Sequence, residues 1–169
     1  MTAERKIARL FNLNDENWMR HANPWSVWTR YSVLPVIAFA FWSRLWIGWW
    51  CILPAVVAIL WMILNPVLFS KPKSTKNWAS KAVMGERVYL NRDNVEIPTV
   101  HQSPIFKILN TISFIGVVLS VWAIVVYSVW GVVLGVTLSY LGKTWYLDRM
   151  VWLFEDMKDI SPEYKAWEY

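Results

Sequence analysis

The chain has 169 residues and a formal net charge of +5; 56% of its residues are hydrophobic and only 17% are charged. Soluble domains carry about 25% charged residues, so this composition excludes an ordinary soluble domain and indicates an integral membrane protein. The single cysteine, Cys51, excludes an intrachain disulfide and a four-cysteine metal site. We expect residues 1–169 to form one membrane domain.

The first segment, residues 1–13, lacks the apolar core and cleavage site of a signal peptide. Its apolar side chains share one face of a helix, and its basic side chains fall elsewhere: Ile7, Leu10 and Phe11 against Arg5, Lys6 and Arg9. This pattern predicts an amphipathic helix that lies on the membrane surface. An ordinary solvated helix is the alternative.

The first predicted span covers about residues 24–42. Asn23 is a good helix cap, and Pro24 suits the first helical position. The run of about 19 residues is close to the 30 Å that a membrane core requires. Arg30 lies near the start, where its side chain can reach the interface. Pro35 predicts a kink.

The second predicted span covers about residues 45–64. Only Ser43 and Arg44 separate it from the first span, and a single helix through both would far exceed the membrane thickness. A tight helical hairpin that turns near these two residues is therefore expected. Asn65 and Pro66 should end or bend the second span.

The polar segment at about residues 70–103 is predicted to be a loop outside the membrane. Asn77 is placed to cap a short helix from Trp78 to about Arg87. Two short apolar stretches, 88–90 and 95–97, flank a turn and suit a small β-hairpin.

The third and fourth spans are predicted at about residues 104–127 and 130–153, with a very short connection at Ser128. The helical pattern of the fourth continues to about Met157. That length exceeds what the membrane needs, so its end should project into the cytoplasm. The fold class predicted from these segments is all-α, with four transmembrane helices arranged as two hairpins.

The distribution of basic residues predicts the orientation. Four Lys or Arg residues precede the first span, Arg30 lies near its start, and the central loop holds six, whereas the hairpin turns hold only Arg44. The positive-inside rule then places both termini and the loop on the cytoplasmic side of the cell membrane. Because these residues lie beside membrane segments, they do not indicate nucleic-acid binding.

Two motifs carry a resemblance. The stretch from Trp18 to Arg30 (WMRHANPWSVWTR) and the later Gly85–Leu90 (GERVYL) are similar to a family of small prokaryotic multi-pass membrane proteins known as a domain of unknown function. The resemblance covers most of the chain. It implies a membrane protein, and the family offers no established activity to carry over.

The first motif places His21, Asn23 and Arg30 near one membrane edge. Arg30 is suited to a lipid phosphate or an anionic ligand, and His21 to a ligand or a proton. A structural interpretation is favoured, in which Asn23 caps a helix, Arg30 reaches the interface and His21 lies at the interface.

Glu86 and Arg87 extend this candidate ligand site to the loop. The favoured role for this pair is structural, with Glu86 paired to Arg149 and Arg87 to Asp148. No nucleophile or second acid lies at a recognisable spacing, so no catalytic residue is predicted.

The only histidines, His21 and His101, both precede a helix start on the same predicted side. They are weak candidates for a metal or a haem, with Glu86, Asp93 or Glu96 as further ligands. Metal-binding helix spacings are absent. The sequence therefore predicts no metal and no cofactor, and bound lipid instead.

Two further groups are candidates for packing against lipid or a partner. One is aromatic, around the first hairpin: Trp42, Trp46, Trp49 and Trp50. An interfacial aromatic belt is its favoured role, and a stacking surface for a partner is the alternative. The other is Gly131 and Gly135, a Gly-x-x-x-Gly pair that suits close helix packing within the bundle or between copies.

The function expected from these observations is a non-enzymatic membrane subunit or accessory protein that packs against other membrane proteins, against copies of itself and against lipid. One alternative is an enzyme or a binder of lipid headgroups or anions at the cytoplasmic edge. Another is a small oligomeric channel. The only acidic residue within the span bounds is Asp148, near the cytoplasmic end of the fourth span, and the absence of acidic residues deeper in the spans argues against a proton-coupled transporter.

Overall fold

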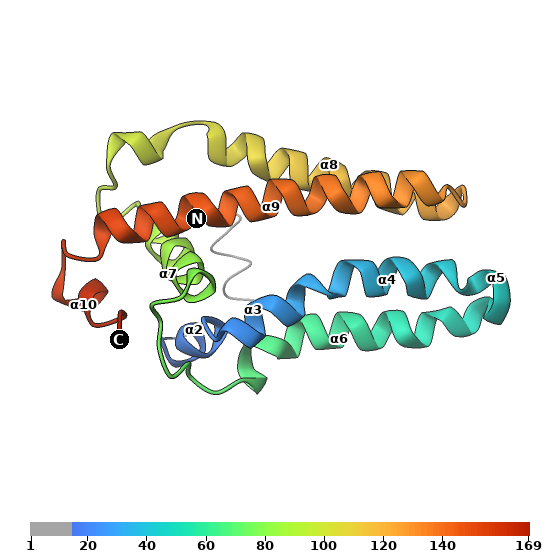
Figure 1. The fold of residues 1–169 in the computed structure, drawn as a ribbon, viewed down its shortest axis with the longest axis horizontal. Helices are drawn as coiled ribbons and strands as arrows, with labels where there is room; N and C mark the ends of the chain where they lie inside the picture. Colours follow the sequence, from blue (N-terminus) through green and yellow to red (C-terminus); the bar gives the residue numbers. More distant parts are fainter. Residues whose placement is uncertain (1–14) are drawn as a thin grey trace. The chain divides into compact units, whose positions relative to one another are not determined.

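The computed structural model describes residues 15–169, which are helical throughout their regular structure and contain no strand (Figure 1). The all-α prediction is therefore confirmed for this part of the chain. The amphipathic helix predicted for residues 1–13 lies outside the described residues. The elements are α2 (Asp15–His21), α3 (Pro24–Tyr31), α4 (Val33–Trp42), α5 (Arg44–Ile47), η1 (Gly48–Cys51), α6 (Ile52–Leu68), α7 (Trp78–Leu90), η2 (Thr99–Gln102), α8 (Ile105–Val125), α9 (Val129–Met157) and α10 (Pro162–Lys165).

The chain divides into two compact units. Among the described residues, unit 1 contains 15–29, Ile63–Ser103 and Leu147–Tyr169, and unit 2 contains Arg30–Met62 and Pro104–Tyr146. Each unit combines segments that are far apart in the sequence.

A helical hairpin forms the first half of unit 2, as predicted. Figure 1 shows α4 and α6 as its two arms, with α5 at the turn. Gly48 has a φ of +56°, a left-handed conformation that glycine adopts without steric cost. The turn, which runs through α5 and η1, is longer than expected, so the second arm begins at Ile52 rather than near residue 45.

The two prolines of this hairpin act differently. Helix α4 begins after a break at Ser32, where the ring of Pro35 would otherwise meet the carbonyl four residues earlier. The predicted kink is thus a break between α3 and α4. Pro66, in contrast, lies inside α6, which continues to Leu68. Of the two predicted outcomes, that Asn65 and Pro66 end or bend the second span, an end of the helix at these residues was wrong.

Helices α8 and α9 form the second hairpin, and small residues let their backbones meet. A Cβ atom added at Gly116 would lie 2.3 Å from the backbone nitrogen of Ser139. One added at Gly135 would lie 2.6 Å from the backbone nitrogen of Ser120. Glycine is the only residue that fits such contacts, so the sequence fixes α8 against α9 in one register.

By length and composition, two helical stretches of the described residues are able to cross a membrane, namely Pro24–Leu68 and Thr99–Val125. The first of these contains the whole α4–α6 hairpin.

Unit 1 has a core of large side chains from α7 and the last part of α9. The fully buried members are Val83, Met84, Val88, Met150, Leu153, Phe154 and Met157. Asn77 caps α7 by accepting a hydrogen bond from the backbone nitrogen of Ser80 at 2.9 Å. The predicted short helix is confirmed. It extends to Leu90 because Val88 belongs to the buried face, so the β-hairpin suggested for 88–97 was wrong.

Residues 161–169, here called the C-terminal strap, pack back onto the start of the loop. The backbone nitrogen of Thr75 donates to the carbonyl of Tyr169 at 2.9 Å, and its hydroxyl donates to that of Trp167 at 2.7 Å. Lys81 pairs with Glu155 and, at 3.1 Å, with Glu168. The strap therefore joins the loop to the end of α9.

Charges in this network stabilise one another. The hydrogen bond to Glu155 raises the pKa of Lys81 above its ordinary value. The hydrogen bond from Lys158 lowers the pKa of the Glu155 carboxyl, and Lys81 lowers that of Glu168. The carboxylates are thus held in their charged form.

Candidate functional site

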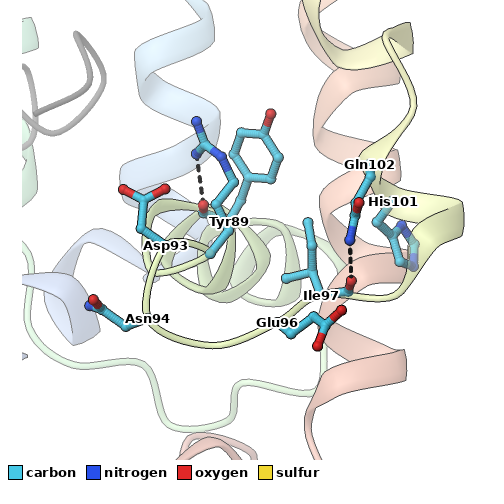
Figure 2. Close-up of a pocket in the computed structure, with 8 residues that line it drawn as sticks. Tyr89, Asp93, Asn94, Glu96, Ile97, His101 and Gln102 are labelled. Carbon is cyan, nitrogen blue, oxygen red and sulfur yellow. Dashed lines mark hydrogen bonds between the residues drawn. The ribbon is translucent and has the colours of Figure 1, made fainter.

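A polar pocket of about 580 Å³ opens in unit 1 beside the end of α7 (Figure 2). Its wall comes from the last turn of α7, the following turn and η2. The lining residues are Tyr89, Arg92, Asp93, Asn94, Glu96, Ile97, His101 and Gln102.

His101 is the most constrained side chain of this pocket. It lies in η2, is only 2% exposed, and places Nε2 2.7 Å from a carboxylate oxygen of Asp156 near the end of α9. A carboxylate in this position fixes the orientation of an imidazole ring. The neighbouring Gln102 amide donates to the carbonyl of Ile97 at 2.9 Å, which ties η2 to the preceding turn (Figure 2).

The opposite wall is built on Tyr89. The guanidinium carbon of Arg92 lies 4.0 Å from the centre of the Tyr89 ring, and its Nη1 donates to the Tyr89 carbonyl at 2.8 Å. Figure 2 shows Asp93 and Glu96 on different sides of the turn. The pocket therefore offers polar groups to a small molecule, but its two carboxylates do not converge on one point.

The histidines do not form a metal site in the described residues, where no group of three or more potential metal ligands occurs. His101 is engaged with Asp156. His21 is the last residue of α2, and its ring lies edge-on to Trp18 with centroids 5.7 Å apart.

Asn23 is a helix cap, as the favoured interpretation predicted. Its Oδ1 accepts from the backbone nitrogen of Trp25 at 3.0 Å, and its Nδ2 donates to the carbonyl of Ser70 at 2.9 Å. The second bond joins the start of α3 to the start of the loop. Arg30 belongs to unit 2, whereas His21, Asn23, Glu86 and Arg87 belong to unit 1.

Arg87 contacts the C-terminal strap. Its guanidinium lies 4.1 Å from the centre of the Trp167 ring and 3.9 Å from a Glu163 carboxylate oxygen. Asp148, its predicted partner, accepts from the indole nitrogen of Trp78 at 3.1 Å instead.

Arg149 was the predicted partner of Glu86. Both residues are half-buried in unit 1. The Arg149 guanidinium lies 4.6 Å from the centre of the Trp152 ring, one turn further along α9. Arg87, Arg92 and Arg149 thus each lie over an aromatic ring, whose face accepts a cation.

The tryptophans of the first hairpin have two different environments. Trp46, Trp49 and Trp50 are 68%, 84% and 77% exposed. Trp42 instead lies edge-on to Tyr127 in the turn of the second hairpin, with centroids 5.8 Å apart. Three of the four thus form an exposed aromatic tip.

Arg44 joins the two hairpin turns inside unit 2. Its Nε donates to the hydroxyl of Tyr127 at 2.5 Å, and its Nη2 donates to the carbonyls of Ile124 and Val125 at 3.3 and 3.1 Å. Both carbonyls belong to the last turn of α8, where helical carbonyls lack their usual partner four residues later. Arg44 therefore caps α8 from the neighbouring hairpin.

Gly131 and Gly135 both face α8. Gly135 meets Ser120 and the carbonyl of Gly116, and Gly131 meets Ala123. Of the two roles considered for this pair, packing within the bundle is the one that the geometry fits. Gly116 and Gly142 also lie against the backbone of the facing helix, and a Gly-x-x-x-Gly spacing does not reveal them.

A buried polar network at the end of the first hairpin was also missed. Asn65 is fully buried; its Oδ1 accepts from the hydroxyl of Ser26 at 2.7 Å, and its Nδ2 donates to the hydroxyl of Thr29 at 2.9 Å. The signal was present, since Ser26 and Thr29 lie three residues apart and share a helix face. The proximity of Pro66 led to Asn65 being interpreted as a helix end.

The comparisons with known proteins give one result. A model for a family of unknown function, DUF6653, matches residues 2–167. The chain belongs to this family. No curated protein and no solved structure matches it. Family membership extends over both units and confirms the resemblance to a domain of unknown function, so the function has to be argued from the geometry.

Proposed function

We propose that this DUF6653 protein is a four-span membrane protein that acts as a non-enzymatic accessory subunit, packing laterally against lipid and another membrane protein. One observation carries this proposal: the large apolar side chains of unit 2 point outward. Phe114 is 68% exposed and Trp130 is 82% exposed, and many neighbours on all four helices are similar. Contiguous exposed apolar surface on this scale is a mark of contact with lipid or protein.

The hairpins support four crossings. The apolar stretch Pro24–Leu68 contains the turn at Ser43–Cys51, so it is long enough to pass the membrane twice and return. The stretch Thr99–Val125 contains α8, whose backbone touches that of α9 at Gly116 and Gly135. Because the two backbones touch, we expect α9 to cross the membrane beside α8.

The inner polar groups of unit 2 bond to each other and to the backbone. The Ser113 hydroxyl donates to the carbonyl of Ser139 at 3.0 Å, and that of Ser120 donates to the carbonyl of Gly116 at 2.9 Å. This leaves the outer surface apolar, with Trp46, Trp49 and Trp50 at one tip. An apolar surface with an aromatic end suits lateral packing better than catalysis.

The excess of basic residues in the loop and before the first span supports the proposal that the loop and both termini are cytoplasmic and that the protein lies in the plasma (inner) membrane. Single cysteines in a Cys51→Ala background test this arrangement: Trp49→Cys and Val129→Cys in the turns, Lys73→Cys in the loop, and Lys165→Cys in α10. A membrane-impermeant maleimide should label the first two in intact cells and the last two only after permeabilisation. Labelling that puts Lys73→Cys and Lys165→Cys on opposite sides would show that only one of α8 and α9 crosses.

Partner binding is tested separately. Purification of the tagged chain from native membranes in a mild detergent should retain a defined membrane protein, identified by native mass spectrometry. Trp49→Ala with Trp50→Ala should weaken this retention, whereas Lys165→Ala in unit 1 should not. A chain that runs alone with lipid in several mild detergents contradicts the accessory role, even where the four crossings hold.

A further inference from the structure

The loop that follows α6 carries an exposed group of lysines, here called the basic loop (residues 70–77). Lys71, Lys73 and Lys76 are exposed, and none of them forms an ion pair within residues 15–169. The sequence from Ser70 to Gly85 contains no Asp or Glu. Lys81, in the same stretch, is different because Glu155 and Glu168 compensate its charge.

The basic loop lies at the ends of two apolar helices. It begins directly after α6, and Asn23 at the start of α3 donates to the carbonyl of Ser70 at 2.9 Å. Trp25 and Leu68, the apolar residues next to this junction, are 71% and 60% exposed. Apolar and aromatic side chains beside lysines are the composition of a surface that meets lipid headgroups.

The C-terminal strap holds the backbone of the basic loop in one conformation. Thr75 is fully buried and bonded to Tyr169 and Trp167, and the hydroxyl of Ser74 donates to the carbonyl of Tyr169 at 2.9 Å. The hydroxyl of Tyr169 in turn donates to the carbonyl of Pro72 at 3.2 Å. The backbone is thus fixed from inside while the lysines point outward.

The three charges act together on a flat anionic surface. An extended chain advances at most about 3.6 Å per residue, so the Cα atoms of Lys71 and Lys76 lie within about 18 Å of each other. At physiological salt, interactions between exposed charges are screened over about 8 Å. The separation between neighbouring lysines of the basic loop is of this order. Every lysine beside an anionic leaflet strengthens association about fivefold.

We propose that the basic loop, with Trp25 and Leu68 beside it, is a docking surface for the anionic phospholipid headgroups of the leaflet next to the loop. This inference rests on the proposed membrane crossings and names the lipid that the protein selects. Charge complementarity carries it, because three exposed ammonium groups with no acidic side chain in their own segment match the negative charge of phospholipid headgroups.

The test uses the full chain reconstituted in phosphatidylcholine bilayers, with spin-labelled phosphatidylglycerol or phosphatidylcholine as the probe. The ratio of their association constants with the protein should favour phosphatidylglycerol at least about threefold. Lys71→Gln, Lys73→Gln and Lys76→Gln together should bring this ratio close to one. The triple Lys→Arg variant keeps the charge and should keep the preference.

Two further readouts separate the outcomes. A preference that persists in the triple Gln variant, or that is absent from the native chain, overturns the inference while leaving the membrane crossings intact. Soluble inorganic phosphate, compared with a chloride salt of equal ionic strength, should not compete; full competition would indicate a free-phosphate site and overturn the leaflet assignment. A chain that alkaline carbonate extracts from the bilayer overturns both this inference and the proposed function.

Discussion

The two units place their large apolar side chains in opposite positions. Unit 1 buries Met84, Met150 and Phe154 completely and exposes charged groups. Unit 2 exposes residues of the same size, such as Phe114 and Trp130, and buries small ones. Phe106 and Leu109 in the first turns of α8 are large exceptions, but many of its buried positions are small: Ala38, Ala40, Ala55, Ala58, Gly116, Ser120 and Ala123.

This difference shows that one chain uses two kinds of packing. In water, burial of large apolar side chains drives folding. In lipid, the tails are as apolar as the side chains, so helices associate through close backbone contacts between small residues. With unit 2 in the membrane, as proposed, the same amino acid has a different energetic role in each unit, and substitutions can test that contrast.

The largest expected effect is the difference between two phenylalanines. Phe154→Ala in unit 1 removes a fully buried ring, and its cavity should cost about 3–5 kcal/mol of unfolding free energy. Phe114→Ala in unit 2 is the matched change at an exposed position and should cost less than about 0.5 kcal/mol. Denaturant titration of both variants in the same detergent measures the difference; similar losses would contradict the proposed inversion.

Gly116→Ala should have the second largest effect. Its Cβ would meet the backbone of Ser139 and Gly135, which cannot yield as a flexible side chain does, so α8 and α9 must separate. A cost of about 2–3 kcal/mol is expected from such overpacking. Val133→Ala, at a half-exposed position of α9, is the control and should be nearly neutral. Thermal unfolding in detergent provides the comparison.

Asn65→Leu tests the buried polar network of unit 1. The change removes the hydrogen bond between the Asn65 amide oxygen and the fully buried Ser26 hydroxyl and should cost about 1–2 kcal/mol. Adding Ser26→Ala should recover part of the loss, because both polar groups are then absent. If the double variant is no more stable than the single one, the hydrogen bond is not the source of the effect. The readout is again the unfolding midpoint in denaturant.

The smallest effect should follow acidification. Because Glu155 and Glu168 have lowered pKa values in the folded chain, their contribution is present above the ordinary carboxyl value of 4.5 and is lost as the pH falls below it. The amide hydrogens of the C-terminal strap should then exchange faster, because the free energy of opening the strap falls by less than about 1 kcal/mol. Hydrogen exchange of residues 161–169 at neutral and acidic pH measures this.

Lys81→Gln provides the matched change at neutral pH. It removes the cation that pairs with both carboxylates, so exchange in the strap should already be faster and should respond less to acid. An unchanged acid response in this variant would assign the effect to other groups.

The sequence predicted the fold well where one physical signal dominated. Apolar runs bounded by Asn23, Ser43 and Ser128 were sufficient to locate two hairpins, and Asn77 marked the start of α7. Errors occurred where tertiary contacts decide. Helix α6 continues through Pro66 to Leu68, and α7 continues to Leu90 with Val88 fully buried in the core of unit 1.

The candidate site was harder to predict, for a related reason. His101 and Asp156 lie 55 residues apart, and no local spacing indicates that they meet. Arg87 and Trp167 are also brought together only by the strap. The cap at Asn23, which depends on the next two residues alone, was predicted correctly.

Arg44 has a consequence for biogenesis. In a four-span arrangement it crosses the bilayer with the first hairpin, before Ile124, Val125 and Tyr127 have been synthesised. An arginine in the bilayer centre costs about 2.5–3.5 kcal/mol on insertion scales. After Arg44 has crossed, its donors bind water or lipid headgroups until the second hairpin is synthesised. The second hairpin then supplies two carbonyls and a hydroxyl to it. Because the first hairpin is synthesised first, its Arg44 donors are satisfied by protein only when the second hairpin inserts with its turn on the same side.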